Sequence, residues 1–169
     1  MSSQIWQRLR SEAESVIQRE PLLASYVYAC VLNHNSLESA LGFILANKLS
    51  DDVMPAISEG ELFEFAFVTS PELVHDAASD ILAVHERDAA TRSYLQAILF
   101  LKGFQAIQVH RLAHCLWQND RKELALFIQS RNSQVFGVDI HPACRIGRGI
   151  MLDHATGIVI GETTVIDDN

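Results

Sequence analysis

The sequence contains a histidine with nearby carboxylates that could transfer a proton. His154 directly follows Asp153, and Asp139 lies earlier in the same segment. Histidine can act as a general base because its unperturbed pKa, about 6.5, lies close to working pH. A carboxylate behind the ring can hold the correct tautomer and stabilise the protonated form. The residue types alone favour a structural role for Asp139, as a cap where the sequence pattern changes.

Two other sets of reactive side chains are expected to be structural. His110 and His114 have the i, i+4 spacing of a metal-binding histidine pair, but the residues between them lack the glutamate of HExxH, and no third ligand is evident. We expect both to pack in a core or an interface, and we expect Cys144 to pack rather than to act as a nucleophile. Cys30, Cys115 and Cys144 form no CxxC motif, which favours a reduced cytoplasmic setting.

The composition is that of a soluble globular protein. Of 169 residues, 49% are hydrophobic and 20% are charged, which suits one ordinary domain or two small ones. The formal net charge is −8, and no cluster of Lys and Arg is dense enough to follow a phosphate backbone. Nucleic acid is therefore not expected as a partner. No uncharged apolar run is long enough to predict a membrane span.

The first part of the chain has the pattern of an all-helical domain. Apolar residues follow helical spacing from the N-terminus until Pro21 interrupts them. Helix-start signals recur at three places: Asn35 with Glu38, Ser58 with Glu61, and Ser70 before Pro71. Two longer helices are predicted over residues 94–117 and 121–136, although Gly103 weakens the continuity of the first. Gly137 stands where a helix end favours a residue that tolerates positive φ.

After Gly137 the helical period gives way to a six-residue period. Aliphatic residues open the successive units at Ile140, Ile146, Leu152, Ile160 and Ile166. The third unit, LDHATGIV, is two residues longer than the others. Such a period is typical of a hexapeptide β-helix, in which three units form one triangular coil with aliphatic side chains inside. On a coil of about 18 residues, Asp139 and His154 would lie on adjacent coils, about 5 Å apart in the stacking direction. An irregular glycine-rich loop is the alternative.

The pattern therefore predicts an α+β chain in two parts. Residues 1–137 would form a helical domain, and residues 138–169 would form the first coils of a left-handed parallel β-helix. A β-helix that stops within its second coil leaves an open edge, and repeat folds generally need three or more repeats for stability. We therefore expect these residues to be a truncated, proteolysed or partial form of a longer protein.

These segments together resemble one enzyme family. VDIHPACRIGRGIMLDHATGIVIGETTVI, residues 138–166, is similar to the first β-helix coils of bacterial and plant serine acetyltransferases. The helical domain of that family is resembled by EPLLASYVYACVLNH, LANKL, MPAI, RDAATRSYLQAILFLKGFQAIQVHRLAH and ALFIQSRNSQVFGVDIHP. The family usually has proline at position 89 and histidine at position 105, where this chain has Ala89 and Gln105. Ala89 could loosen the loop that presents Asp88.

The resemblance implies acetyl transfer from acetyl-CoA to the hydroxyl of L-serine, giving O-acetyl-L-serine for cysteine biosynthesis. His154 matches the family's general base, and Asp139 matches the carboxylate that orients it. Asp88 and Asp153 resemble the carboxylates that hold the substrate ammonium. Without the resemblance, Asp88 would be interpreted as a solvated acid in a charged run. Acetyl-CoA is the implied co-substrate, and the family chemistry requires neither a permanently bound cofactor nor a metal.

The resemblance also implies partners. Family members form a trimer through the β-helix and a hexamer through the helical domain, and a C-terminal tail binds O-acetylserine sulfhydrylase. Their later coils carry an Arg-His pair for the serine carboxylate and most of the acetyl-CoA groove. We therefore expect residues 1–169 alone to have little or no activity.

Two other functions stay open at this point. The helical part could be a non-catalytic oligomerisation module, since apolar helices outnumber the catalytic parts. The chain could also belong to a β-helix acyltransferase with another acceptor, such as homoserine or a sugar. Assaying the acceptors side by side separates these possibilities.

Overall fold

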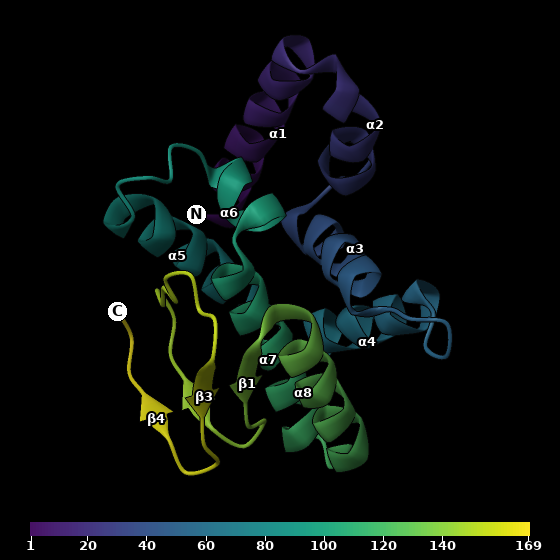
Figure 1. Ribbon diagram of the computed structural model, residues 1–169, viewed down its shortest axis with the longest axis vertical. Coiled ribbons are helices and arrows are strands. Elements are labelled where there is room, and N and C mark those ends of the chain that lie inside the picture. Colours follow the sequence, from purple (N-terminus) through teal and green to yellow (C-terminus); the bar gives the residue numbers. More distant parts are fainter.

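Helices fill most of the chain, and short strands follow them. The computed structural model describes residues 1–169. The helical elements are α1 (Ser2–Arg19), the 3-10 helix η1 (Pro21–Leu23), α2 (Ala24–Val27), the π-helix η2 (Tyr28–Leu32), α3 (Leu37–Leu49), α4 (Ala56–Thr69), α5 (Glu72–Arg87), α6 (Tyr94–Phe100), α7 (Lys102–Gln118) and α8 (Lys122–Phe136). The strands are β1 (Val138–Ile140), β2 (Arg145–Ile146), β3 (Ile158–Ile160) and β4 (Val165–Ile166). In Figure 1, α1 and α2 lie at one end of the long axis, and the strands lie with α8 at the other.

The helix starts lie close to the predicted positions but are displaced along the chain. The N-caps are Ser36, Pro55 and Pro71, where Asn35, Ser58 and Ser70 were expected. The start predicted at Tyr94 is confirmed, and it carries a capping box that was not predicted: Ser93 accepts a hydrogen bond from the backbone N–H of Gln96, whose side chain accepts one from the N–H of Ser93. The S-x-x-Q spacing is the signal that identifies this capping box. Gly137 ends α8 with φ of 68°, which confirms its predicted role.

The helix predicted over residues 94–117 is broken into α6 and α7 at Leu101. Leu101 has φ −94° and ψ 103°, an extended conformation that no helix contains. The buried side-chain amide of Gln105 donates to the carbonyl of Ile98 at 2.8 Å, so it satisfies a carbonyl that the end of α6 leaves without a helical partner. Gln105, which departs from the family pattern, therefore has a structural role at this break.

Two apolar clusters form the core. The first joins α1, α5 and α6, and the second joins α4, α7, α8 and β1. Val138, Ile140 and Cys144 are buried in the second cluster, so the start of the strand region packs directly against the helices. None of the helices combines the length and the apolar character that a membrane crossing requires.

The strands pair in parallel, one coil apart. β1 pairs with β3, with Val138 opposite Ile158, and β2 pairs with β4, with Arg145 opposite Val165. The offset is 158 − 138 = 20 residues for the first pair and 165 − 145 = 20 for the second. Three six-residue units give 18, so the longer unit LDHATGIV supplies the remaining two. The predicted coil of 18 residues is therefore too short by two.

Glu59 is a buried carboxyl group without a hydrogen-bond partner. Its side chain in α4 is 0% exposed, and neither of its oxygens accepts a hydrogen bond. Burial raises the pKa of Glu59 to about 7, against the opposing attraction of the Arg131 guanidinium. The charged form loses its hydration on folding, and no protein group replaces it.

We expect Glu59→Gln to stabilise the protein at pH 8 and to have little effect near pH 4.5. In the unfolded chain this carboxyl loses its proton near its ordinary pKa of 4.5, whereas the folded protein retains the proton up to about pH 7. The free energy of unfolding therefore falls as pH rises through this window, and the penalty is complete above pH 7. The expected gain at pH 8 is about 1–3 kcal/mol, measured from urea unfolding. Glu61→Gln, which alters an exposed carboxyl of the same helix, is the control; an equal gain at both pH values would contradict the prediction.

Candidate functional site

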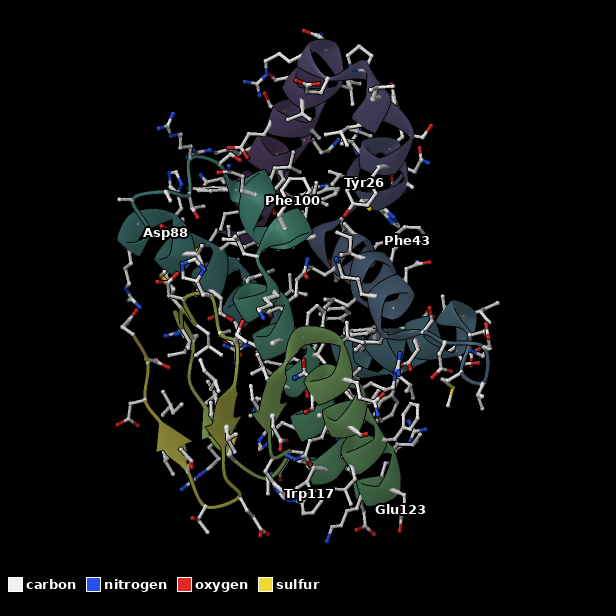
Figure 2. All side chains as sticks on the ribbon, in the orientation of Figure 1. Tyr26, Phe43, Asp88, Phe100, Trp117 and Glu123 are labelled. Carbon is white, nitrogen blue, oxygen red and sulfur yellow. The ribbon has the colours of Figure 1, made fainter.

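A pocket of about 480 Å³ lies where the segment between β2 and β3 passes the ends of α5, α6 and α7. Three of the predicted site residues line it: Asp88, Asp153 and His154. Lys102 and Thr91 add polar groups, and the rest of the wall includes Phe100, Leu101, Phe104, Met151 and Leu152. Figure 2 shows Asp88 at the end of α5 that faces this segment. The structure therefore brings together residues that are far apart in the sequence.

Asp88 is fixed by its own loop. It is the C-cap of α5, and its carboxylate accepts hydrogen bonds from the hydroxyl of Thr91 and from the backbone N–H of Ala90. These bonds, the Thr91 bond first, hold the pKa of Asp88 below its usual value, and the nearby His154 acts in the same direction. Thr91 is only 6% exposed, so the loop is attached to the core even though Ala89 replaces the usual proline. Asp88 is thus a fixed, ionised carboxylate at the pocket wall.

His154 sits on a strained turn. His154 and Ala155 have φ of 53° and 63°, in the left-handed region that residues with a Cβ seldom adopt. Ala155 is buried in the second core cluster, which holds the turn in place, while the His154 side chain is 93% exposed at the pocket mouth. Its Nε2 lies 3.8 Å from Oδ1 of Asp153. Backbone strain of this kind persists only where the surroundings enforce it, and it concentrates at functional sites.

The first turn of α7 contacts the segment that carries His154, at Leu152 and at Thr156. The Lys102 Nζ donates to the hydroxyl of Thr156 at 2.5 Å. A Cβ added to Gly103 would lie 2.0 Å from the carbonyl oxygen of Leu152, so only glycine allows the helix and the segment to approach this closely. From the sequence alone, Gly103 indicates only a weak point in a helix. An isolated glycine within a helical pattern is the signal that could have indicated such a close approach.

Asp139 lies apart from the pocket. Its Oδ1 accepts a hydrogen bond from the side-chain amide of Gln129 on α8 at 2.8 Å. In the parallel ladder its partner is Val159, and no hydrogen bond or ion pair joins it to His154. Because the coil has 20 residues, the expected stacking of Asp139 on His154 does not occur within one chain. The catalytic role of Asp139 stays a prediction.

His110 and Cys144 are buried, as expected, and His114 is partly buried. His110 is 2% exposed with its Nε2 3.7 Å from the sulfur of Cys144, and burial lowers its pKa to about 3. His114 donates from Nδ1 to the carbonyl of Pro142 at 2.7 Å. Burial raises the pKa of the Cys144 thiol to about 11, far from that of a nucleophile at neutral pH. No group of three or more His, Cys, Asp or Glu side chains is arranged to hold a metal ion.

Comparison with known proteins places these features in context. A family model described as "Serine acetyltransferase, N-terminal" matches residues 5–109. The sequence is 48% identical over 169 residues to the serine acetyltransferase of Haemophilus influenzae, covering 100% of this chain and 63% of the relative. It is 50% identical over 165 residues to that of Escherichia coli K12, covering 98% of this chain and 60% of the relative. The chain thus spans less than two thirds of the length of these curated relatives.

Solved structures agree closely in fold. A serine acetyltransferase in complex with CoA superposes with a TM-score of 0.98 at 49% identity, covering 99% of this chain and 72% of that one. The soybean serine acetyltransferase complexed with serine gives a TM-score of 0.96 at 47% identity, covering 99% and 69%.

Proposed function

The chain belongs to the serine acetyltransferase family, and from this premise we propose that its protein transfers the acetyl group of acetyl-CoA to the hydroxyl of L-serine. One observation carries the proposal: Asp88, Asp153 and His154 line a single pocket, although they come from two distant parts of the chain. This set combines a proton acceptor with two anions, which suits an amino alcohol that carries an ammonium group. Solved relatives bound to CoA and to serine support the same two substrates.

His154 is the proposed general base. Its imidazole accepts the proton of the serine hydroxyl as the oxygen attacks the thioester carbonyl of acetyl-CoA. The new C–O bond forms, the C–S bond breaks, and the departing CoA thiolate takes up the proton from the His154 imidazolium, which restores the neutral base. The ring is 93% exposed and therefore open to a substrate, and Asp153 lies 3.8 Å away, where it stabilises the positive charge that develops on the ring.

Asp88 and Asp153 are the proposed ligands of the substrate ammonium. An ammonium ion is a compact cation that anionic oxygens hold well, and such positioning lowers the barrier by ordering the reactants before the chemical step. The lowered pKa of Asp88 keeps its carboxylate ionised at the pH where His154 must be neutral. The two groups would then fix the amino acid while its hydroxyl faces the base.

We further propose that residues 138–169 begin a left-handed parallel β-helix and that residues 1–137 form an oligomerisation domain. The parallel ladders with a constant 20-residue offset support the first part. Exposed apolar side chains on consecutive helical elements support the second: Leu22, Leu23, Tyr26, Tyr28 and Phe43. Figure 2 labels Tyr26 of α2 and Phe43 of α3 on neighbouring elements of the helical part. Such a surface suits trimers that join into a hexamer.

Binding of O-acetylserine sulfhydrylase through a C-terminal tail and a cytoplasmic location both stay predictions. A purely non-catalytic module is the weaker alternative, because assembly alone does not require three polar groups in one pocket.

The test is an assay of thiol release from acetyl-CoA with L-serine, homoserine and a sugar as acceptors, using the full-length protein. Serine should be the preferred acceptor. Asp88→Asn should raise the KM for serine about 10- to 100-fold and leave the KM for acetyl-CoA within about twofold, because the ammonium loses an anionic ligand. Asp52→Asn, an exposed acid outside the pocket, is the matched control. A faster reaction with another acceptor, or an equal rise in both KM values, would count against the proposal.

A further inference from the structure

Asp80 is a fully buried acid whose hydrogen bonds cross between α5, α7 and the segment before His154. It is 0% exposed. Its carboxylate accepts from the Gln108 side chain at 2.8 Å and from the backbone N–H of Ile150 at 2.9 Å. Arg111 donates to both carboxylate oxygens: its Nε lies 3.1 Å from Oδ2, and its Nη2 lies 2.8 Å from Oδ2 and 3.1 Å from Oδ1.

Arg111 extends this network to the strand region. Its Nη1 donates to the carbonyl of Ile146 at 3.3 Å, and its Nη2 donates to the carbonyl of Gly147 at 2.8 Å. Together, Asp80 and Arg111 therefore hold three backbone groups of residues 146–150 against the helices; we refer to this pair as the Asp80–Arg111 clamp. Arg87, near the end of α5, adds a fourth bond to the carbonyl of Gly149 at 2.9 Å.

Stability alone does not account for a charged clamp at this depth. Burial raises the pKa of Asp80, against the attraction of Arg111, which shows that desolvation of the carboxylate opposes the ion pair. A well-packed apolar pair of similar volume is often as stable as a buried ion pair, or more stable. An apolar pair, however, could not bind the N–H of Ile150 or the carbonyls of Ile146 and Gly147.

Two arms of similar length run from the clamp to the pocket. Asp88 lies 88 − 80 = 8 residues along α5, about 12 Å at the rise of a helix. His154 lies 154 − 150 = 4 residues beyond Ile150, at most about 14 Å of extended chain. Both arms start at the bond between Asp80 and the N–H of Ile150, and both end in the same pocket. That bond is therefore the common reference point for the two halves of the site.

We propose that Asp80 and Arg111 are positioning residues that set the distance between Asp88 and the Asp153–His154 pair, and so restrict the acceptor to the length of serine. This inference rests on the proposed acetyl transfer. A rigid spacing favours an ammonium and a hydroxyl that are two carbons apart, and it disfavours the longer homoserine. When the Asp80–Arg111 clamp is weakened, the pocket should discriminate less between serine and homoserine, although Asp88, Asp153 and His154 are still present.

The test compares Asp80→Asn and Arg111→Lys with Asp76→Asn in the full-length protein. Asp76 faces the same arginine, at 3.7 Å, but makes no bond to residues 146–150, so it is the matched control. Both clamp variants should raise the KM for serine about tenfold. They should also lower the ratio of kcat/KM for serine over homoserine at least fivefold, with the KM for acetyl-CoA unchanged. Asp76→Asn should keep the wild-type ratio.

Hydrogen exchange measured by mass spectrometry separates this inference from the proposed function. Exchange over residues 148–154 should be faster in the two clamp variants and unchanged in Asp76→Asn. Arg111→Lys keeps the buried charge pair, so it serves if Asp80→Asn fails to fold. A uniform loss of kcat for both acceptors with unchanged KM values, or unchanged exchange, would overturn the positioning role. Wild-type protein that acetylates no serine, with faster exchange in the variants, would overturn the proposed function and the selectivity with it.

Discussion

Replacing His154 by alanine is expected to lower kcat for acetyl transfer to serine by about 10²–10⁴, which is the usual contribution of a positioned general base. The KM for acetyl-CoA should stay within about twofold, because the imidazole accepts a proton rather than binding the co-substrate. Folding should be little affected, since the side chain is 93% exposed and contributes no packing. Steady-state thiol release and thermal unfolding of the same preparations measure both effects.

His154→Ala that retained more than about a tenth of wild-type kcat would exclude this base. Asp139→Asn provides the companion measurement. If Asp139 orients the ring in the active assembly, its loss should also lower kcat, and the double variant should be no worse than His154→Ala because both act through one imidazole. If Asp139 only holds Gln129, the variant should change stability and leave kcat intact.

Gly103→Ala is expected to damage both stability and activity, against the usual effect of this change in a helix. The added Cβ would lie 2.0 Å from the oxygen and 3.0 Å from the carbon of the Leu152 carbonyl, and backbone cannot move aside as a flexible side chain can. Overpacking of this kind costs about 1–3 kcal/mol. Because Leu152 is two residues from His154, a displacement of about 1 Å should lower kcat/KM about 10²-fold.

Gly60→Ala is the matched control for this prediction. Gly60 lies within α4, and a Cβ there would meet nothing within 4 Å. Alanine should therefore stabilise the protein by about 0.5–1 kcal/mol through helix propensity and leave activity unchanged. The urea unfolding midpoint and kcat/KM are measured for both variants. If Gly103→Ala stabilised the protein as much as Gly60→Ala, the close approach to Leu152 would not restrict position 103.

Local features of the fold were predictable from the sequence, and the departures have identifiable physical causes. The six-residue aliphatic period predicted the coil, and the length of LDHATGIV accounts for the 20-residue register. The start of α3 was displaced by one residue because Ser36 rather than its neighbour Asn35 provides the side-chain cap. The break at Leu101 has no proline to signal it; the buried bond from Gln105 to Ile98 supports it instead.

The site was not predictable from residue types alone. Histidine is a residue type that suits proton transfer, but the choice of His154 among seven histidines, and of Asp153 beside it, came from the family resemblance. Asp88 was identified only through family resemblance, because nothing local to a charged run shows that it meets a segment more than sixty residues later. Asp80 and Gly103 were missed for the same reason: each depends on a contact that only the folded chain creates.

The two surplus residues in the long unit have a consequence for how chemistry enters a repetitive architecture. In a uniform solenoid every position is assigned by the repeat either to the interior or to the surface. The two extra residues allow a turn at His154 and Ala155 that does not follow the repeat. The repeat continues after this turn, because both strand pairs keep the same 20-residue offset. Reactive side chains can therefore be placed or exchanged at this two-residue insertion, while the strand register on either side of it stays the same.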